Sequence, residues 1–331
     1  MKLRKLANFL DKSRLRPVLA ACMPARGIVC LNYHRIGDGS RSRLDRGLWS
    51  ASAEAFDRHL AWLKLHSEVI SPADIDMARK DVRNRHVLIT FDDGYQDNYD
   101  LAFSTLQRHG LPATFFIATG FIDDPRLPWW DEIAGQIRCT EHGAIDLPEW
   151  LPEPLPLIVG EREPVIRTLL RKFKSLPGEE ADRFLSDLRE ATQACPTSLH
   201  HEDLWMTWDM LREMDAAGMT IGGHTVNHIV LSRAPAEEQW EEISTCATRI
   251  ETEIGKRMDY FAYPVGDRNS FNKDSIDCLR RLGVRYAFSY YGGLARADAD
   301  CYDMPRIAIE PHVDQSWFRG IIELPRLFGR Q

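Results

Sequence analysis

The 331-residue sequence contains no apolar run of 18 residues, the length that a transmembrane helix requires. It also lacks low-complexity tracts and internal repeats, which are typical of disordered chains and solenoids. Basic residues are not in excess, because the formal net charge is −7, whereas nucleic-acid binders normally present a basic face. These absences argue against a membrane-spanning protein and a nucleic-acid binder, and they favour an ordinary globular protein.

Cysteine pairs with C-x-x-C spacing are absent as well, and the cysteine count of seven is odd. Both observations favour buried free thiols in a reducing compartment over a disulfide framework. The cysteines are Cys22, Cys30, Cys139, Cys195, Cys246, Cys278 and Cys301.

The N-terminus is basic but lacks the features of a good secretory signal. Asn8 and Asp11 interrupt any apolar run, and the run from Pro17 to Met23 is short. We expect residues 1–26 to form a helical extension that either packs on the domain or lies on a membrane surface as an amphipathic helix. The expected location is cytoplasmic, with peripheral membrane association left open.

Short β-rich runs that alternate with helical patterns are what the sequence does contain. This alternation indicates parallel strands with right-handed crossovers, and therefore predicts an α/β fold, a distorted (β/α) barrel spanning residues 27–331. Polar residues follow the strands, at the end where such barrels carry their reacting groups. About seven strands are expected, at residues 27–34, 86–91, 113–118, 219–223, 260–263, 286–289 and 304–309, with helices at 53–65, 98–109 and 209–217.

An oversized connection at about residues 122–205 separates the third and fourth expected strands. A segment of this length is not expected to be structureless, and helical patterns occur near residues 163–176 and 179–192. We interpret it as a helical insertion at the mouth of the barrel. It is either a lid or a peripheral scaffold or dimer contact.

Two carboxylates, Asp92 and Asp93, stand at the end of the second expected strand in Thr90-Phe-Asp-Asp-Gly94. A turning chain lets both reach one cavity, where one carboxylate binds a cation and the other remains free as a base. An Asp-Asp-Gly sequence is also common turn chemistry, so the motif is weak by itself.

Two histidines follow the fourth expected strand in His224-Thr-Val-Asn-His228. We expect them at the start of a helix, where residues four apart share one face and converge on one metal ion. Together with one aspartate they would leave coordination positions open for water and substrate, as a catalytic site requires.

These two motifs resemble the first two signature motifs of the polysaccharide deacetylases, the NodB-homology group or carbohydrate esterase family 4. Phe261-Ala-Tyr-Pro-Val-Gly266 resembles the third motif, and the resemblance extends from about residue 27 to 310. Asn32-Tyr-His-Arg-Ile36 looks like the Tyr-His segment of the poly-N-acetylglucosamine deacetylase branch.

The resemblance implies that Asp93, His224 and His228 bind a divalent metal ion, with Zn expected first and Co, Ni, Mn or Fe as alternatives. It implies that Asp92 is the general base for attack of metal-bound water on an N-acetyl carbonyl. A backbone N–H of the Tyr263-Pro264 loop is the candidate donor to the resulting oxyanion.

The sequence departs from the family pattern in two places. Ala262 stands where many members carry the arginine that orients the base, and the late histidine that serves as general acid is not recognisable. The resemblance to the Tyr-His branch makes His34 the candidate general acid. Arg306, at the end of the last strand, is the candidate for holding Asp92, with Arg35 in reserve.

The expected function is removal of N-acetyl groups from amino sugars of a polysaccharide, oligosaccharide or lipid-linked glycan. Alternatives are an O-deacetylase, a small amide or imide hydrolase, and a catalytically decayed metal- or carbohydrate-binding protein. Aromatic residues at the expected mouth would stack on sugar faces. They are Trp129, Trp130, Tyr263 and Tyr290.

Overall fold

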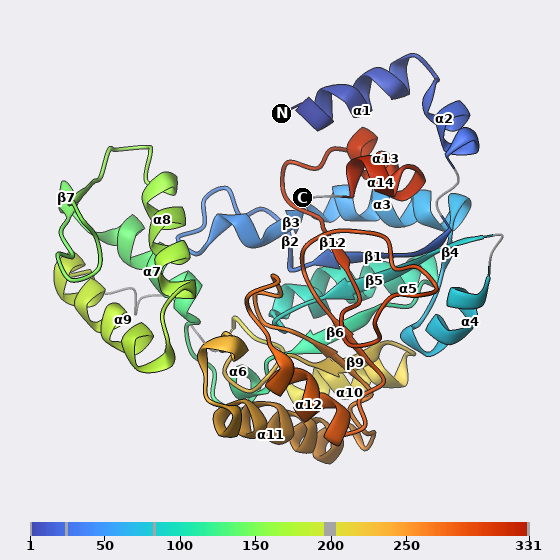
Figure 1. Ribbon diagram of the computed structural model, residues 1–331. Helices are drawn as coiled ribbons and strands as arrows, with labels where there is room; N and C mark the ends of the chain where they lie inside the picture. The colour runs from blue at the N-terminus through green and yellow to red at the C-terminus, as the bar shows by residue number, and fades with distance from the viewer. Residues whose placement is uncertain (1, 24–25, 82–83, 195–202, 330–331) are drawn as a thin grey trace.

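Seven parallel strands form the main sheet of the computed structural model, which describes residues 2–23, 26–81, 84–194 and 203–329 (Figure 1). Their order is β11-β10-β9-β6-β5-β1-β12, and the short β4 (Glu68–Val69) pairs with the start of β5. The strands are β1 (Gly27–Tyr33), β5 (Arg85–Phe91), β6 (Thr114–Ile117), β9 (Thr220–Gly223), β10 (Tyr260–Ala262), β11 (Tyr286–Phe288) and β12 (Arg306–Ala308).

Hydrogen bonds between β11 and the segment before β12 nearly close this sheet into a barrel. Met304 forms a parallel bridge with Phe288, and its N–H donates to the carbonyl of Ala287 at 2.9 Å. The N–H of Ser289 in turn donates to the carbonyl of Met304 at 2.9 Å. The predicted fold class, a distorted (β/α) barrel with about seven parallel strands, is therefore confirmed.

The central strands are buried on both faces, which explains why they read as short apolar runs in the sequence. Every residue of β1 is buried, and in β5 only Arg85 is partly exposed. The register of these two strands pairs Asn32 with Thr90 and Tyr33 with Phe91. Their carboxyl ends therefore lie at the same height, where the next residues on each chain are His34 and Asp92.

Helices cover the outside of the sheet (Figure 1). α3 begins after Ser52, whose hydroxyl caps it by accepting the N–H of Ala55 at 3.2 Å. The helix predicted at residues 98–109 is present, but its first part is a π-helix (Asn98–Phe103). The covering helices are α3 (Ala53–His66), α4 (Ile75–Lys80), α5 (Ser104–His109), α6 (Thr119–Asp123), α10 (Trp208–Ala216), α11 (Ala236–Ile254), α12 (Lys273–Arg281), α13 (Gln315–Glu323) and α14 (Pro325–Phe328).

The N-terminal segment forms two helices, α1 (Lys2–Lys12) and α2 (Arg16–Cys22), which pack against α13. Ala7 and Leu10 are the buried apolar residues of α1. None of the helices in the described ranges is long and apolar enough to cross a membrane.

The long connection folds as a separate helical layer beside the barrel, on the left of Figure 1. It consists of α7 (Trp129–Cys139), an antiparallel pair β7 (Ala144–Ile145) and β8 (Leu155–Pro156), α8 (Glu163–Lys174) and α9 (Gly178–Thr192). A second small pair, β2 (Arg35–Ile36) and β3 (Trp49–Ala51), lies between β1 and α3 along the chain.

The six cysteines within the described ranges are all free thiols. Cys30, Cys246 and Cys278 are buried as predicted, whereas Cys22 is exposed on the N-terminal helices. Cys195 lies outside the described residues.

Candidate metal centre and active site

Two consecutive aspartates follow β5 at the point where the chain turns. Asp93 and Gly94 have positive φ values of 78° and 98°, a conformation that ends the strand. In a continuing strand, neighbouring side chains would point to opposite faces. The turn instead brings both Asp92 and Asp93 to the wall of one cavity, where they are 3% and 2% exposed.

The two histidines lie in a loop after β9, and the prediction that they begin a helix is wrong. Thr225 and His228 have positive φ values of 65° and 54°, which a right-handed helix does not allow. His224 and His228 still approach each other, with ring centroids 4.8 Å apart. The loop conformation brings the two imidazoles together in place of the expected helix face.

A carboxylate from α11 holds this histidine loop. Glu242 accepts the N–H groups of Val226 and Asn227 at 2.9 and 2.8 Å. Within the loop, the hydroxyl of Thr225 accepts the N–H of His228 at 2.9 Å. These bonds replace the intrahelical ones and stabilise two backbone conformations that are uncommon for residues other than glycine.

Asp93, His224 and His228 form a buried cluster that fits a divalent metal ion. One ligand atom from each lies within 4.8 Å of the others. Oδ1 of Asp93 is 3.5 Å from Nε2 of His224 and 3.4 Å from Nε2 of His228, and this oxygen has no hydrogen-bond partner among the described residues. Nδ1 of His224 must be the donor to the carbonyl of Ala262 at 2.8 Å, which leaves the lone pair of Nε2 facing the cluster.

The charge states of this cluster also suit a metal site. Burial, reinforced by the neighbouring His224, lowers the pKa of His228 to about 3, so its imidazole is neutral. Burial alone would raise the pKa of Asp93, but close contact with the imidazole of His224, together with the nearby His228 and His34, holds this pKa below its ordinary value. A neutral imidazole and an ionised carboxylate are the forms that coordinate metals.

Removing one member of the cluster is expected to abolish tight metal binding. Losing a hydrogen-bond partner of a ligand weakens metal affinity by roughly 10–100-fold, so losing the ligand itself should cost more than about 100-fold. Calorimetric titration of Zn²⁺ and the visible spectrum of Co²⁺ would measure this for Asp93→Ala and His228→Ala. The control is His66→Ala, an exposed histidine at the end of α3. Equal affinity in all four proteins would exclude this cluster as the metal site.

Arg306 lies against Asp92 and forms two hydrogen bonds with it. Nη1 donates to Oδ1 at 2.6 Å and Nη2 donates to Oδ2 at 2.8 Å. Nε of Arg306 donates to the carbonyl of Ser289 at 3.1 Å, which fixes the guanidinium plane. Asn32 donates from Nδ2 to Oδ2 of Asp92 at 2.9 Å. The carboxylate is therefore oriented from two strands, β12 and β1.

These contacts determine the charge of Asp92. Burial by itself would raise its pKa, but the charge of Arg306, then His224, and the Arg306 hydrogen bonds hold the pKa of Asp92 well below its usual range. Asp92 is consequently ionised, and it lies beside the cluster of Asp93, His224 and His228 without belonging to it.

Asn32 was not singled out in the sequence, although a signal was present. Asn32 lies on β1, two residues before His34, which directly follows this strand. Alternate residues of a strand share a face. Since β1 and β5 pair with Asn32 opposite Thr90, the same reasoning points Asn32 towards Asp92, two residues further on.

Comparison with known families identifies the chain. The polysaccharide deacetylase family model matches residues 79–156 and 163–287, more than half of the sequence. The chain belongs to the polysaccharide deacetylase family. It is accordingly a hydrolase that acts on carbon–nitrogen bonds other than peptide bonds.

Two curated relatives and two solved structures are similar to this chain, and the solved structures share its fold. YxkH of Bacillus subtilis, named as a polysaccharide deacetylase, is 20% identical over 88% of this chain and 75% of its own length. The poly-β-1,6-N-acetyl-D-glucosamine N-deacetylase of Escherichia coli is 30% identical, over 31% of this chain and 15% of its own length. The structure of the Streptococcus pyogenes deacetylase PplD, solved with acetate, has a TM-score of 0.60 at 18% identity. The match covers 92% of this chain and 100% of the PplD chain. IcaB from Ammonifex degensii has a TM-score of 0.57 at 18% identity, over 87% of this chain and 94% of its own.

The structure of this deacetylase shows what lies at the positions that depart from the family pattern. Ala262, which replaces the arginine of the third motif, contributes its carbonyl as the acceptor for His224. A guanidinium nevertheless lies beside Asp92, and it comes from Arg306 on β12. Arg35, the reserve candidate, is turned away from Asp92 and pairs with Asp97 at 2.7 Å.

His34 lines the same cavity as both aspartates. Its backbone is fixed on both sides, because its N–H donates to the hydroxyl of Ser50 at 2.9 Å and its carbonyl accepts from Nδ2 of Asn98 at 2.7 Å. Its imidazole contacts the ring of Tyr290, with centroids 5.7 Å apart. His312, by contrast, lies half exposed beside Glu310.

The cavity that contains these groups has a volume of about 600 Å³, and both the barrel and the insertion contribute to its wall. The barrel supplies the aspartates, the histidines, Tyr263 and Tyr290. The insertion supplies Trp129, Trp130 and, from α8, Arg167, Arg171 and Lys174. The long connection therefore forms part of the wall of this cavity.

Trp130 connects the insertion to the histidine cluster. Its ring meets that of His228 edge to face at 4.4 Å, and its Nε1 donates to the hydroxyl of Tyr95 at 2.7 Å. Trp130 is only 4% exposed, whereas Trp129 is partly exposed and stacks on Phe173 with centroids 4.3 Å apart. Both rings pack within the protein, and each presents part of its surface to the cavity.

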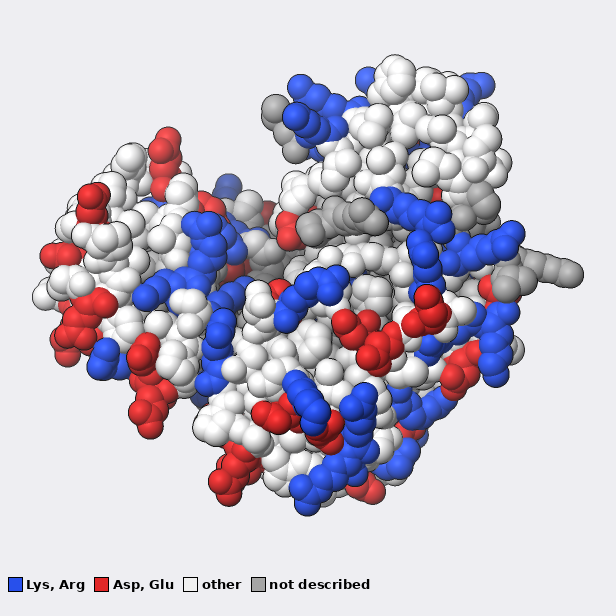
Figure 2. Space-filling model, in the orientation of Figure 1, with Lys and Arg blue, Asp and Glu red and all other residues white. Residues whose placement is uncertain are grey.

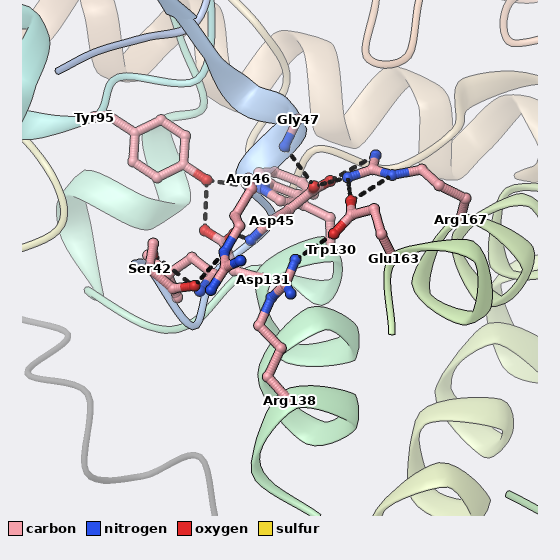
Figure 3. Close-up of polar contacts among 11 residues, drawn as sticks. Ser42, Asp45, Arg46, Gly47, Tyr95, Trp130, Asp131, Arg138, Glu163 and Arg167 are labelled. Atoms are coloured by element: carbon pink, nitrogen blue, oxygen red, sulfur yellow. Dashed lines mark hydrogen bonds and ion pairs between the residues drawn. The ribbon is translucent and has the colours of Figure 1, made fainter. Parts of the chain in front are cut away.

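A polar network ties the insertion to the barrel (Figure 3). Asp131 accepts the Tyr95 hydroxyl at 2.7 Å and the N–H of Asp45 at 2.7 Å, and Asp45 pairs with Arg167 on α8. Burial raises the pKa of Asp131 to about 7, against the opposing charge of Arg35. The same carboxylate thus supports Trp130 through Tyr95, and α8 through Asp45 and Arg167.

In the loop after β10, neither Tyr263 nor Pro264 has a backbone N–H available for an oxyanion. The N–H of Tyr263 already donates to the carbonyl of Phe288 at 3.0 Å, and Pro264 has no N–H. Pro264 is buried and is not among the residues that line the cavity, whereas Tyr263 and Val265 are. Val265 has a φ of 63°, an uncommon conformation for a β-branched residue.

Proposed function

We propose that this polysaccharide deacetylase hydrolyses the N-acetyl groups of amino sugars, in a polysaccharide, an oligosaccharide or a lipid-linked glycan, with a divalent metal ion held by Asp93, His224 and His228. The observation that carries the proposal is that the two neighbouring aspartates contact different partners. Asp93 faces the two histidines, and Asp92 is held by Arg306 and Asn32 beside them.

The bound ion would supply Lewis-acid polarisation of the acetyl oxygen and acidify water at the site, the two difficulties of amide hydrolysis near neutral pH. Zn²⁺ is the first candidate, and Co²⁺, Ni²⁺, Mn²⁺ and Fe²⁺ suit the same nitrogen and oxygen ligands.

Asp92 would accept the proton of the attacking water. Its Oδ1 retains a free lone-pair direction, since Oδ1 accepts one hydrogen bond whereas Oδ2 accepts two. Arg306 and Asn32 keep the carboxylate in one orientation, which places the accepting oxygen without further reorganisation during reaction.

Two further groups would complete the reaction. His34, on the cavity wall near both aspartates, would donate a proton to the departing amine. The N–H of Val265, a residue on the cavity wall that follows Pro264, would donate to the oxyanion. Trp130 and Tyr263 on the same wall would contact the sugar ring.

The amide substrate is supported by the relatives. The Escherichia coli relative that shares 106 aligned residues is named as an N-deacetylase of poly-β-1,6-N-acetyl-D-glucosamine. That match covers 31% of this chain, so the relative's name supports the N-acetyl amide but does not fix the polymer. A cavity of about 600 Å³ lies within the ~300–1,000 Å³ range of small-molecule sites.

The test is release of acetate from N-acetylglucosamine oligomers by the metal-free protein supplied with Zn²⁺, Co²⁺ or Mn²⁺. We expect acetate to appear with metal and to stop on addition of a chelator. Acetylated amines and O-acetylated sugars, compared in parallel, separate N-deacetylation from ester hydrolysis. Metal binding with no acetate from any N-acetylated sugar would overturn the proposal.

A further inference from the structure

The N-terminal helices α1 and α2 expose an unusual share of large apolar side chains. Eleven large hydrophobic residues in the described ranges are exposed, and five of them lie within residues 2–23. Barrel strands hide such residues almost completely, so this concentration is not a general property of the surface. The five are Leu6 (36% exposed), Phe9 (59%), Leu15 (44%), Val18 (57%) and Met23 (44%).

These two helices are nevertheless anchored to the domain by their other face. Ala7 and Leu10 are buried, and α1 and α2 both contact α13. Asn8 donates to Asp314 at 3.1 Å, and Arg16 pairs with Asp11 and Glu323. The exposed apolar side chains are therefore held outward, because the inward face is already occupied.

The charge of this segment is opposite to that of the rest of the chain. Residues 2–23 contain six basic residues and one acidic residue, a net charge of +5. Since the whole chain carries −7, the remainder carries −12. The single acid, Asp11, is already paired with Arg16. In the upper part of Figure 2, where α1 and α2 lie, the surface is mostly white and blue.

Helical spacing places cations directly beside the exposed apolar residues of α1. Lys2 and Leu6 are four residues apart, as are Lys5 and Phe9, and Lys12 follows Phe9 by three. Residues at these spacings are neighbours on a helix surface. All three lysines are exposed, so their amines and the two apolar side chains face the same solvent.

We infer that α1 and α2 dock the protein onto an anionic lipid surface, with Phe9, Leu15 and Val18 entering the headgroup region and the surrounding lysines and arginines contacting lipid phosphates. An apolar stripe flanked by basic residues on a helix that does not span the bilayer is the pattern of interfacial binding. The charge selects this occupant over a second copy of the chain. A two-fold interface would bring two such basic faces together, with no free carboxylate in residues 2–23 to neutralise them.

The experiment uses the full chain and sedimentation with vesicles of phosphatidylcholine containing 30% phosphatidylglycerol, against vesicles of phosphatidylcholine alone. We expect binding to the anionic vesicles and at least about tenfold weaker binding in 0.5 M salt, because surface attraction is screened within a Debye length. Phe9→Ser with Val18→Ser should weaken binding by at least about tenfold. Lys5→Glu with Lys12→Glu should weaken binding to anionic vesicles specifically.

Matched controls are Leu65→Ser and Met77→Ser, which remove side chains that are 80% and 68% exposed on α3 and α4. We expect these variants to bind vesicles as the wild type does. Acetate release from soluble oligosaccharides and the thermal melting curve should be unchanged in all variants, which separates this inference from the proposed catalysis. Equal binding to both vesicle types, no binding to either, or a dimer in light scattering that Phe9→Ser dissociates would overturn it.

Discussion

Replacing Asp92 with asparagine is expected to lower kcat for acetate release by about 10²–10⁴-fold, the range that a positioned acid or base contributes. The amide keeps the shape of the carboxylate but cannot accept the proton of the attacking water. Metal affinity should be nearly unchanged, because the ligand atoms belong to Asp93, His224 and His228. Acetate release under saturating substrate, together with Zn²⁺ titration, measures both quantities.

The matched control is Asp93→Asn, which makes the same carboxylate-to-amide replacement at the neighbouring residue. We expect that variant to lose metal affinity and activity together. If Asp92→Asn lost the metal as well, or if its kcat stayed within a factor of about ten of the wild type, the division of the two aspartates into base and ligand would be wrong.

Replacing Arg306 with methionine is expected to reduce both stability and activity. Arg306 is fully buried, and its removal leaves the buried Asp92 carboxylate without its counter-ion. Breaking a buried pair in this way costs about 3–5 kcal/mol in the free energy of unfolding. Urea unfolding followed by circular dichroism measures this change, and kcat/KM for acetate release measures the second effect.

The pH dependence distinguishes an orienting role for Arg306 from a merely structural one. The pKa of Asp92 lies below its ordinary value in the folded protein. The ion pair of Asp92 with Arg306 therefore stabilises the fold fully at pH values above the unfolded pKa of about 3.9. This stabilisation is lost as the pH falls through the folded pKa. In Arg306→Met, burial acts without opposition from the guanidinium and raises the pKa of Asp92. The stability difference from the wild type should therefore be larger at pH 7 than at pH 4, and the acid limb of kcat/KM should move to higher pH.

Arg35→Met is the control for this experiment, because Arg35 also belongs to a largely buried ion pair, with Asp97. We expect it to be destabilised without a shift of the acid limb. Arg306→Lys should recover part of the lost stability by restoring the charge, without the two-pronged contact. An unshifted acid limb in Arg306→Met would show that Arg306 does not act through Asp92.

The fold could be predicted because its signals are local. Each strand of the barrel is a short apolar run that ends in polar or small residues, and burial on both faces leaves little ambiguity. The polar residues at the strand ends are likewise adjacent in sequence to their strands, which is why Asp92, Asp93 and the two histidines could be singled out. The helix expected at His224 was wrong because a spacing of four residues does not specify backbone conformation. Here the conformation is set by Glu242, which lies in a later helix.

What the sequence could not supply are contacts between distant segments. Arg167 meets Asp45 across 122 positions, and Asp92 meets Arg306 across 214. The sequence predicts the second pair only as an arginine at the end of the last strand, whereas Arg306 in fact begins β12, where the barrel topology returns the chain to β1. No such topological rule applies to the insertion, and its network with Tyr95 and Asp131 was not foreseen.

The position of Arg306 on β12 has a consequence for the order in which the site is assembled. A growing chain contains Asp93, His224 and His228 before it contains residue 306, and β12 joins the sheet by pairing with β1, the most N-terminal strand of the sheet. Until then the Asp92 carboxylate lacks its counter-ion, and burying it carries the full desolvation cost. Asp92 can therefore be buried at low cost only after β12 has supplied Arg306. A chain that ended before residue 306 would hold Asp93, His224 and His228, yet closing its barrel would bury an uncompensated carboxylate. Formation of the proposed centre therefore depends on synthesis of the chain as far as β12.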